Sequence, residues 1–151
     1  LMAKVGATRE PADLFLEICE AVDGPVSAEV VVLDAEGMIE QGHRLAKIHD
    51  NIVIKVPLTE AGLRACSALT NEGIRVNALS PGLIAAGMGQ GAIERRTVDQ
   101  MGRFLESIPS RRPGTVREIS AVVRFLCSPG ASYLTGQNVT VNGGDRTESY
   151  Q

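Results

Sequence analysis

A lysine stands inside an otherwise apolar stretch of this sequence. Lys55 lies in the segment IVIKVP at 52–57, whose short β-branched run predicts a buried strand. Burial disfavours a charged ammonium and favours the free amine, the form that attacks carbonyl carbons to give a Schiff base. A lysine near a strand end can also pack its aliphatic stem and extend its ammonium into solvent. The residue by itself fits both interpretations.

Two further polar side chains are predicted to lie near this lysine. Side chains alternate along a strand, so Ser27 and Glu29 share one face of a first strand, and Arg75 and Asn77 share one face of a third. If neighbouring strands pair in the simplest register, Glu29, Lys55 and Asn77 converge at the carboxyl ends of three parallel strands, where α/β proteins place their sites. Glu29 then acts as a proton shuttle, or it only neutralises Lys55 in a structural ion pair.

Three strands separated by single helices are expected to position these residues. The strands are predicted at 26–33, 52–56 and 74–79. Asp34 and Thr59 have the residue types and positions of helix N-caps directly after the first and second strands. This alternation is typical of successive βαβ units and therefore of a parallel sheet.

The second half of the sequence has a different pattern of predicted elements. A glycine-rich loop is predicted at 81–91 and a helix at 93–105. Thr115 and Glu118 have the spacing of a capping box that opens a further helix. A last strand is predicted at 138–141.

Length and composition indicate one ordinary globular domain. The chain has 151 residues, of which 44% are hydrophobic and 22% are charged. Its formal charge of -3 provides no general attraction to nucleic acid or to anionic membranes, and 3% aromatic residues without Trp provide no stacking platform for bases. We therefore predict a single α/β domain over residues 1–151, a three-layer α/β/α sandwich of about four mainly parallel strands.

Cysteine and histidine spacing does not indicate a metal site. Cys19, Cys66 and Cys127 are far apart, and His43 and His49 do not share a helix face. We expect free thiols in a reducing, cytoplasmic compartment, no metal and no cofactor. No apolar run is long enough to span a membrane.

Several motifs in the first half resemble one enzyme family. VSAEV at 26–30, IVIKVP followed by T-x-x-G, and EGIRVN at 72–77 are similar, in order and spacing, to the middle of small-type transaldolases and fructose-6-phosphate aldolase-like proteins. The resemblance implies a (β/α)8 barrel that acts on sugar phosphates. It implies that Lys55 is the Schiff-base lysine, Glu29 the acidic residue associated with the catalytic water, and Asn77 the asparagine of the following strand. The family's other strands and its phosphate-binding residues are not found in this sequence.

The second half resembles a different family. GIRVNALSPGLI at 73–84 and the stretch from IPSRRPG to VNGG at 108–144 are similar to the C-terminal part of classical short-chain dehydrogenases/reductases. The resemblance implies that Pro81 and Gly82 are remnants of a nicotinamide pocket. The family's glycine-rich turn, catalytic serine and Y-x-x-x-K motif are absent from the sequence, and Ala86 stands where the family often has threonine.

The two resemblances meet at GIRVN, residues 73–77, which both families write almost identically. We therefore interpret the chain as a chimera, with a transaldolase-like segment at 1–77, a dehydrogenase-like segment at 73–151 and a crossover at 73–77. Its fold is expected to be half TIM-barrel-like and half Rossmann-like. A recombinant protein and a natural fusion both fit this interpretation.

Three functions follow as hypotheses. The favoured one is a folded scaffold without a complete active site of either parent. The alternatives are residual aldolase-like Schiff-base chemistry at Lys55 on a small carbonyl or sugar-phosphate ligand, and remnant NAD(P) binding around Pro81 and Gly82. Open strand edges further predict a homodimer formed through a sheet edge or through the last helix and strand.

Overall fold

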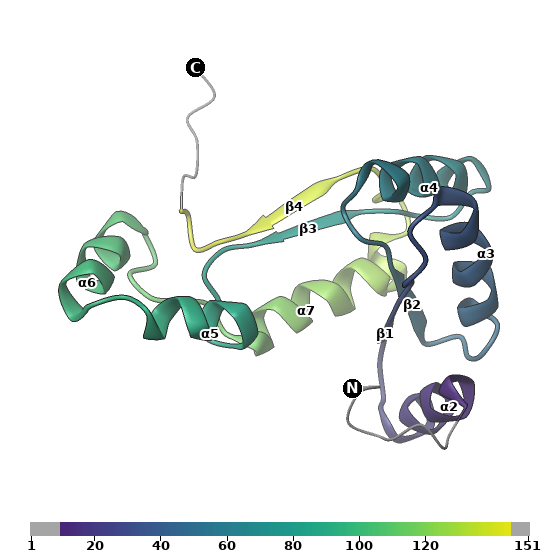
Figure 1. Ribbon diagram of the computed structural model, residues 1–151, viewed down its shortest axis with the longest axis horizontal. Helices are drawn as coiled ribbons and strands as arrows, with labels where there is room; N and C mark the ends of the chain where they lie inside the picture. Colours follow the sequence, from purple (N-terminus) through teal and green to yellow (C-terminus); the bar gives the residue numbers. More distant parts are fainter. Residues whose placement is uncertain (1–9, 146–151) are drawn as a thin grey trace. The chain divides into compact units, whose positions relative to one another are not determined.

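A computed structural model describes residues 10–145 of the chain (Figure 1). Its elements in chain order are α2 (Pro11–Ala21), β1 (Val26–Glu29), α3 (Ala35–Ala46), β2 (Ile52–Lys55), α4 (Glu60–Asn71), β3 (Ala78–Pro81), α5 (Gly87–Glu94), α6 (Val98–Ser107), α7 (Val116–Cys127), the short 3-10 helix η1 (Pro129–Ala131) and β4 (Asn138–Val141). The chain divides into two compact units, with the boundary between Val76 and Asn77. That boundary falls inside the predicted crossover at 73–77.

The α/β class and the parallel strands are as predicted. Within that class, the strands of the described residues form two sheets rather than the single one predicted: β1 pairs with β2, and β3 pairs with β4, both in parallel. The physical reason is that strand pairing joins residues far apart in the chain, and local pattern does not specify which strand is the partner.

The first unit has helices on one face of its sheet. Val26 and Ala28 of β1 are buried together with Ile52 of β2 and Cys19 of α2. Beyond them, Val30 packs with residues of α3 and α4, among them Met38 and Ala65. The alternate residues of β1 and the last residue of β2 are exposed, so no described residue covers the opposite face of the sheet, which we call its open face.

Local sequence explains why the helices of this unit begin where they do. The Asp34 carboxylate accepts a hydrogen bond from the Gly37 N–H at 2.8 Å, and the Thr59 hydroxyl accepts one from the Gly62 N–H at 3.0 Å. Both predicted N-caps are confirmed. Each helix therefore begins within a few residues of the strand that precedes it.

The strand predicted at 74–79 lies further along the chain. Gly73, with φ +82°, ends α4, and the Ile74 N–H still bonds to the carbonyl of Leu69. β3 begins only at Ala78, whose N–H donates to the Gln137 carbonyl at 2.8 Å. The partner segment before β4 thus determines where this strand starts.

The predicted loop at 81–91 and the predicted helix at 93–105 also differ from the structure. Helix α5 already begins at Gly87, inside the predicted loop. The single helix predicted at 93–105 is divided, because α5 ends at Glu94 and α6 begins at Val98. Thr97 and Gln100 form a capping box, which starts α6 as a separate helix. The capping box predicted at Thr115 and Glu118 is confirmed at the start of α7.

Candidate functional site

The Glu29 and Lys55 side chains lie together at the carboxyl ends of β1 and β2. The two residues are register partners, and the Lys55 Nζ lies 3.1 Å from the Glu29 Oε2. Both side chains are half exposed, at 59% for Lys55 and 50% for Glu29. An ammonium and a carboxylate at this distance form an ion pair, and the carboxylate is close enough to take part in the proton transfers that imine chemistry requires.

Backbone hydrogen bonds on either side keep this pair in register. The Val26 N–H donates to the Asn51 carbonyl at 2.8 Å, and the Val30 N–H donates to the Lys55 carbonyl at 3.1 Å. Beneath the pair, Ala28 and Val30 are buried against the helices. The buried side of the sheet therefore positions the two polar groups on its open side.

Lys55 is exposed, which agrees with the second of the two interpretations drawn from the sequence, a lysine near a strand end that extends its ammonium into solvent. It is the last residue of β2, and it shares the open face with Ser27 and Glu29. The apolar residues around it in the sequence include Ile52 and Ile54, which pack on the helical side instead. Alternation along the strand, rather than the local average of hydrophobicity, decides its exposure.

Asn77, the third predicted site residue, belongs to the second unit. Its side-chain N–H donates to the Leu134 carbonyl at 2.9 Å, and its side-chain oxygen accepts from the Gln137 N–H at 3.1 Å. β3 does not pair with β2, so the register from which convergence with Glu29 and Lys55 was predicted is absent. In this structure the Asn77 amide holds the segment that leads into β4.

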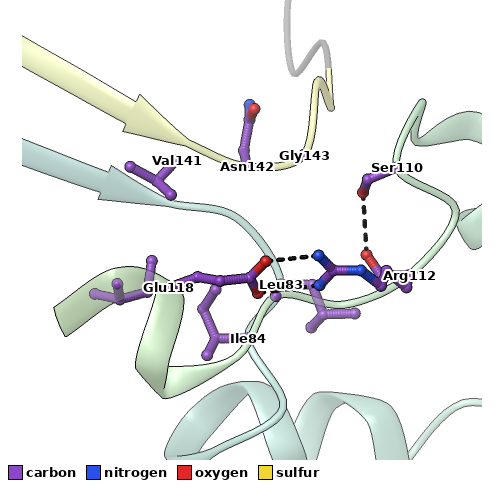
Figure 2. A pocket seen from close by; sticks show the side chains of 10 residues that line it. Leu83, Ile84, Ser110, Arg112, Glu118, Val141, Asn142 and Gly143 are labelled. Atoms are coloured by element: carbon purple, nitrogen blue, oxygen red, sulfur yellow. Dashed lines mark hydrogen bonds and ion pairs between the residues drawn. The ribbon is translucent and has the colours of Figure 1, made fainter. Parts of the chain in front are cut away.

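A second feature is a cavity of about 250 Å³ in the second unit (Figure 2). It lies beyond the carboxyl ends of β3 and β4 and beside the first turn of α7. Its lining comprises Leu83, Ile84, Ser110, Arg112, Gly114, Glu118, Ile119, Val141, Asn142 and Gly143. Aliphatic side chains make up much of this wall.

The charged groups of the cavity are paired with each other. Arg112 donates through both terminal nitrogens to Glu118, at 2.6 and 3.0 Å, and Glu118 also accepts from the N–H and the hydroxyl of Thr115. These hydrogen bonds lower the pKa of the Glu118 carboxyl to about 2, and the same pairing raises the pKa of Arg112. Sequence reasoning identified the capping role of Glu118 but missed its partner, because nothing in local spacing pairs Arg112 with it.

Pro81 and Gly82, the predicted remnants of a nicotinamide pocket, lie at the end of β3. The Gly82 N–H donates to the Val141 carbonyl at 3.0 Å, and a Cβ on this glycine would come within 2.8 Å of the Asn142 Cα. The close approach of the backbone at the end of β4 is therefore sufficient to explain why this position is a glycine. The cavity lining begins one residue later, at Leu83.

Within residues 10–145, no group of three or more His, Cys, Asp or Glu side chains is arranged to hold a metal ion. Nor does any helix in that range have the length and apolar character that crossing a membrane requires.

Comparison with known proteins distinguishes the two halves of the chain. Residues 9–78 match the family model for transaldolase/fructose-6-phosphate aldolase. A probable transaldolase of Geobacter sulfurreducens is 60% identical over 77 residues, which are 51% of this chain and 35% of that protein. A probable transaldolase of Jannaschia sp. is 62% identical over 69 residues, or 46% of this chain and 32% of that protein. The chain thus spans about a third of the length of these curated relatives.

Fold comparison leads to another group of proteins. The structure of YwfH, described as an NADPH dependent reductase involved in bacilysin biosynthesis, has a TM-score of 0.56 at 19% identity, covering 91% of this chain and 74% of that one. A short-chain dehydrogenase/reductase from Brucella melitensis has a TM-score of 0.50 at 24% identity, covering 91% and 72%. At these identities the likeness is one of fold. Transaldolase-like sequence in the first half together with a reductase-like fold is the combination expected of a chimera of the two families.

Proposed function

We propose that Lys55 captures small carbonyl compounds as an imine, with Glu29 as the group that accepts and returns the proton. The observation that carries this proposal is the 3.1 Å contact between the Lys55 Nζ and the Glu29 Oε2 at the ends of paired parallel strands. The match of residues 9–78 to the transaldolase/fructose-6-phosphate aldolase family supports it. The resemblance of the first half to that family further supports it, because it implies that this lysine forms a Schiff base.

The proposed steps use only these two side chains and the carbonyl compound. The Lys55 ammonium transfers a proton to the Glu29 carboxylate, and the free amine attacks the carbonyl carbon. A carbon–nitrogen bond forms as the π bond of the carbonyl group breaks, and a proton moves from the nitrogen to the oxygen, which becomes a hydroxyl group. Glu29 then returns its proton to this hydroxyl, which leaves as water when the imine forms.

We further propose that this capture is not followed by efficient turnover and that the chain acts mainly as a folded scaffold. The half-exposed state of both side chains supports this second proposal. Water surrounds an exposed pair, so the gain that an enzyme obtains from a dry, preorganised site is small.

Trapping with a reducing agent tests the capture step. The chain has three lysines, Lys4, Lys47 and Lys55, so peptide mass spectrometry after treatment with dihydroxyacetone and sodium cyanoborohydride assigns each adduct. We expect Lys55 to be labelled faster than Lys47, an exposed lysine at the end of α3. Replacing the proton acceptor in Glu29→Gln should slow labelling of Lys55 by about tenfold or more.

Two controls make the result decisive. Lys47→Arg should leave labelling of Lys55 unchanged, and Glu29→Gln should leave labelling of Lys47 unchanged. Equal labelling of Lys55 and Lys47 in the unmodified protein would contradict the proposal.

A further inference from the structure

The open face of the β1–β2 sheet surrounds Lys55 with a particular set of side chains. Ser27, Glu29 and Lys55 are exposed on it, and Val53 stands opposite Ser27 in the register. The hydrogen bond from the Val30 N–H to the Lys55 carbonyl continues the ladder past Glu29. Val31 is the next exposed residue after Glu29, just beyond the end of β1.

The nearest apolar neighbours of Lys55 along these two segments are valines. Val53 lies two residues before Lys55 on β2, and Val31 lies two residues after Glu29, just beyond the end of β1, so each is roughly 7 Å from the pair along the chain. Val31 is 74% exposed, and Leu58, in the segment after β2, is 86% exposed. A ligand attached to the Lys55 nitrogen therefore has apolar side chains nearby, at Val53 on β2 and at Val31 and Leu58 just beyond the two strands.

The charge on this face is already balanced. Among the described residues of β1 and β2, Lys55 is the one cationic side chain, and its ammonium is 3.1 Å from the Glu29 carboxylate. On the neighbouring helices, Arg44 pairs with Glu40 and Arg64 with Glu60. An anionic ligand bound to Lys55 would face the Glu29 carboxylate without a second cation from these strands.

From this environment we infer that the compound captured at Lys55 is an uncharged aldehyde or ketone with an apolar substituent, not a phosphorylated sugar. The inference rests on the proposed function and specifies the substrate class of the same site. The amine of Lys55 forms a bond to the carbonyl carbon, water leaves with the carbonyl oxygen, and the apolar substituent contacts Val31 or Val53.

Two aldehydes of similar size and reactivity test this inference. Benzaldehyde is uncharged, whereas 4-carboxybenzaldehyde carries a negative charge away from its aldehyde group. Each is incubated with the full chain and sodium cyanoborohydride, whose hydride reduces the imine to a stable secondary amine. The ratio of Lys55 to Lys47 labelling, measured by peptide mass spectrometry, removes differences in intrinsic reactivity.

We expect this ratio to be about fivefold higher for benzaldehyde, because its ring can shield roughly 40 Å² of apolar surface from water, whereas the charged end of 4-carboxybenzaldehyde holds its ring in the solvent. Val31→Ser should remove most of the difference. Val22→Ser is the matched control, because Val22 is a partly exposed valine that precedes β1, at the opposite end of the strand from Glu29. It should leave the ratio unchanged.

The other outcomes are distinguishable. An equal or higher ratio for 4-carboxybenzaldehyde would overturn the inference and leave imine formation at Lys55 intact. A preference for benzaldehyde that survives both Val31→Ser and Val53→Ser would overturn the assignment of the apolar substituent to these valines and would leave the Glu29 charge as its cause. If neither aldehyde labels Lys55 faster than Lys47, the proposed function itself fails.

Discussion

Glu118 shows how one carboxylate can serve two purposes in this protein. It closes the capping box with Thr115 at the start of α7, and it binds Arg112 through both of its oxygens. These contacts join the segment before α7 to the helix itself. Because they favour the charged form, they lower the pKa of Glu118 to about 2, from an ordinary value of 4.5.

The lowered pKa predicts a pH-dependent contribution to stability. The contribution is complete above pH 4.5 and decreases as the pH falls towards 2, because the unfolded chain takes up the proton more readily than the folded chain. Glu118→Gln keeps a residue suited to the capping box but removes the charge. In urea unfolding followed by circular dichroism, we expect this variant to be less stable than the parent at pH 7 and to approach it at low pH.

Glu106→Gln, at an exposed glutamate on α6, controls for the general effect of losing one negative charge. It should lower stability less than Glu118→Gln at pH 7. A difference between Glu118→Gln and the parent that stays constant from pH 7 to low pH would disprove the assigned role.

At the scale of elements, two helical glycines have opposite surroundings. A Cβ on Gly62 of α4 would lie 2.0 Å from the Pro57 carbonyl oxygen, whereas a Cβ on Gly102 of α6 would have nothing within 4 Å. Pro57 lies two residues after the end of β2. The T-x-x-G pattern at Thr59 and Gly62 therefore has a steric basis, since the helix start lies against the strand end.

These surroundings predict stability changes of opposite sign. Gly102→Ala should stabilise the protein by about 1 kcal/mol, because alanine favours the helix. Gly62→Ala should be destabilising, by roughly 1–3 kcal/mol, because the new methyl group overlaps a backbone oxygen. Urea unfolding of both variants beside the parent measures this. Stabilisation by Gly62→Ala would show that the end of β2 moves freely relative to α4.

The structure at the carboxyl ends of β3 and β4 allows a prediction about NADH binding. Gly82 packs closely against the end of β4. The volume of the adjacent cavity, about 250 Å³, is below the usual range for cofactor-binding sites. We therefore expect no saturable change in NADH fluorescence on titration with the protein. A commercial NADH-dependent dehydrogenase is the positive control, and saturable binding would contradict the expectation.

How far the sequence could predict the structure depends on the range of each interaction. The caps at Asp34, Thr59 and Thr115 were predictable, because each involves residues three apart. The start of α6 at Thr97 has the same local basis in its capping box with Gln100, but the apolar periodicity around it predicted one continuous helix. Here the apolar periodicity over residues 93–105 led to the wrong prediction, although the capping box at Thr97 and Gln100 marks a helix start.

Long-range interactions explain most of the remaining differences. The partner of β3 lies about sixty residues along the chain, in the register that pairs Ala78 with Asn138, and no local pattern contains that information. The ion pair of Glu29 and Lys55 was predictable because both residues end strands of one βαβ unit. Asn77 was placed with them on the assumption that the next strand would join the same sheet.

At the scale of the whole molecule, each unit leaves strand edges without a partner within the described residues. Each two-stranded sheet has one ladder, so the outer edges of its strands carry unpaired backbone groups. In the first unit the sheet also has an open face. Such features are commonly covered by association with another chain.

We therefore propose that the protein is a homodimer at micromolar concentration, through a sheet edge or through α7 and β4. Size-exclusion chromatography with multi-angle light scattering should give about twice the chain mass of 16.0 kDa. A monomer mass across the micromolar range would exclude this assembly.

The end of β1 is set by a side chain from the middle of a helix. The Gln41 amide oxygen accepts hydrogen bonds from the Val31 N–H at 2.9 Å and from the Val32 N–H at 3.3 Å. Because one acceptor on α3 occupies two successive backbone donors, the strand cannot lengthen unless the helix shifts. The position of α3 along the sheet therefore determines the length of β1. A shift of the helix by one turn would alter where Glu29 stands relative to Lys55, without any change at either residue.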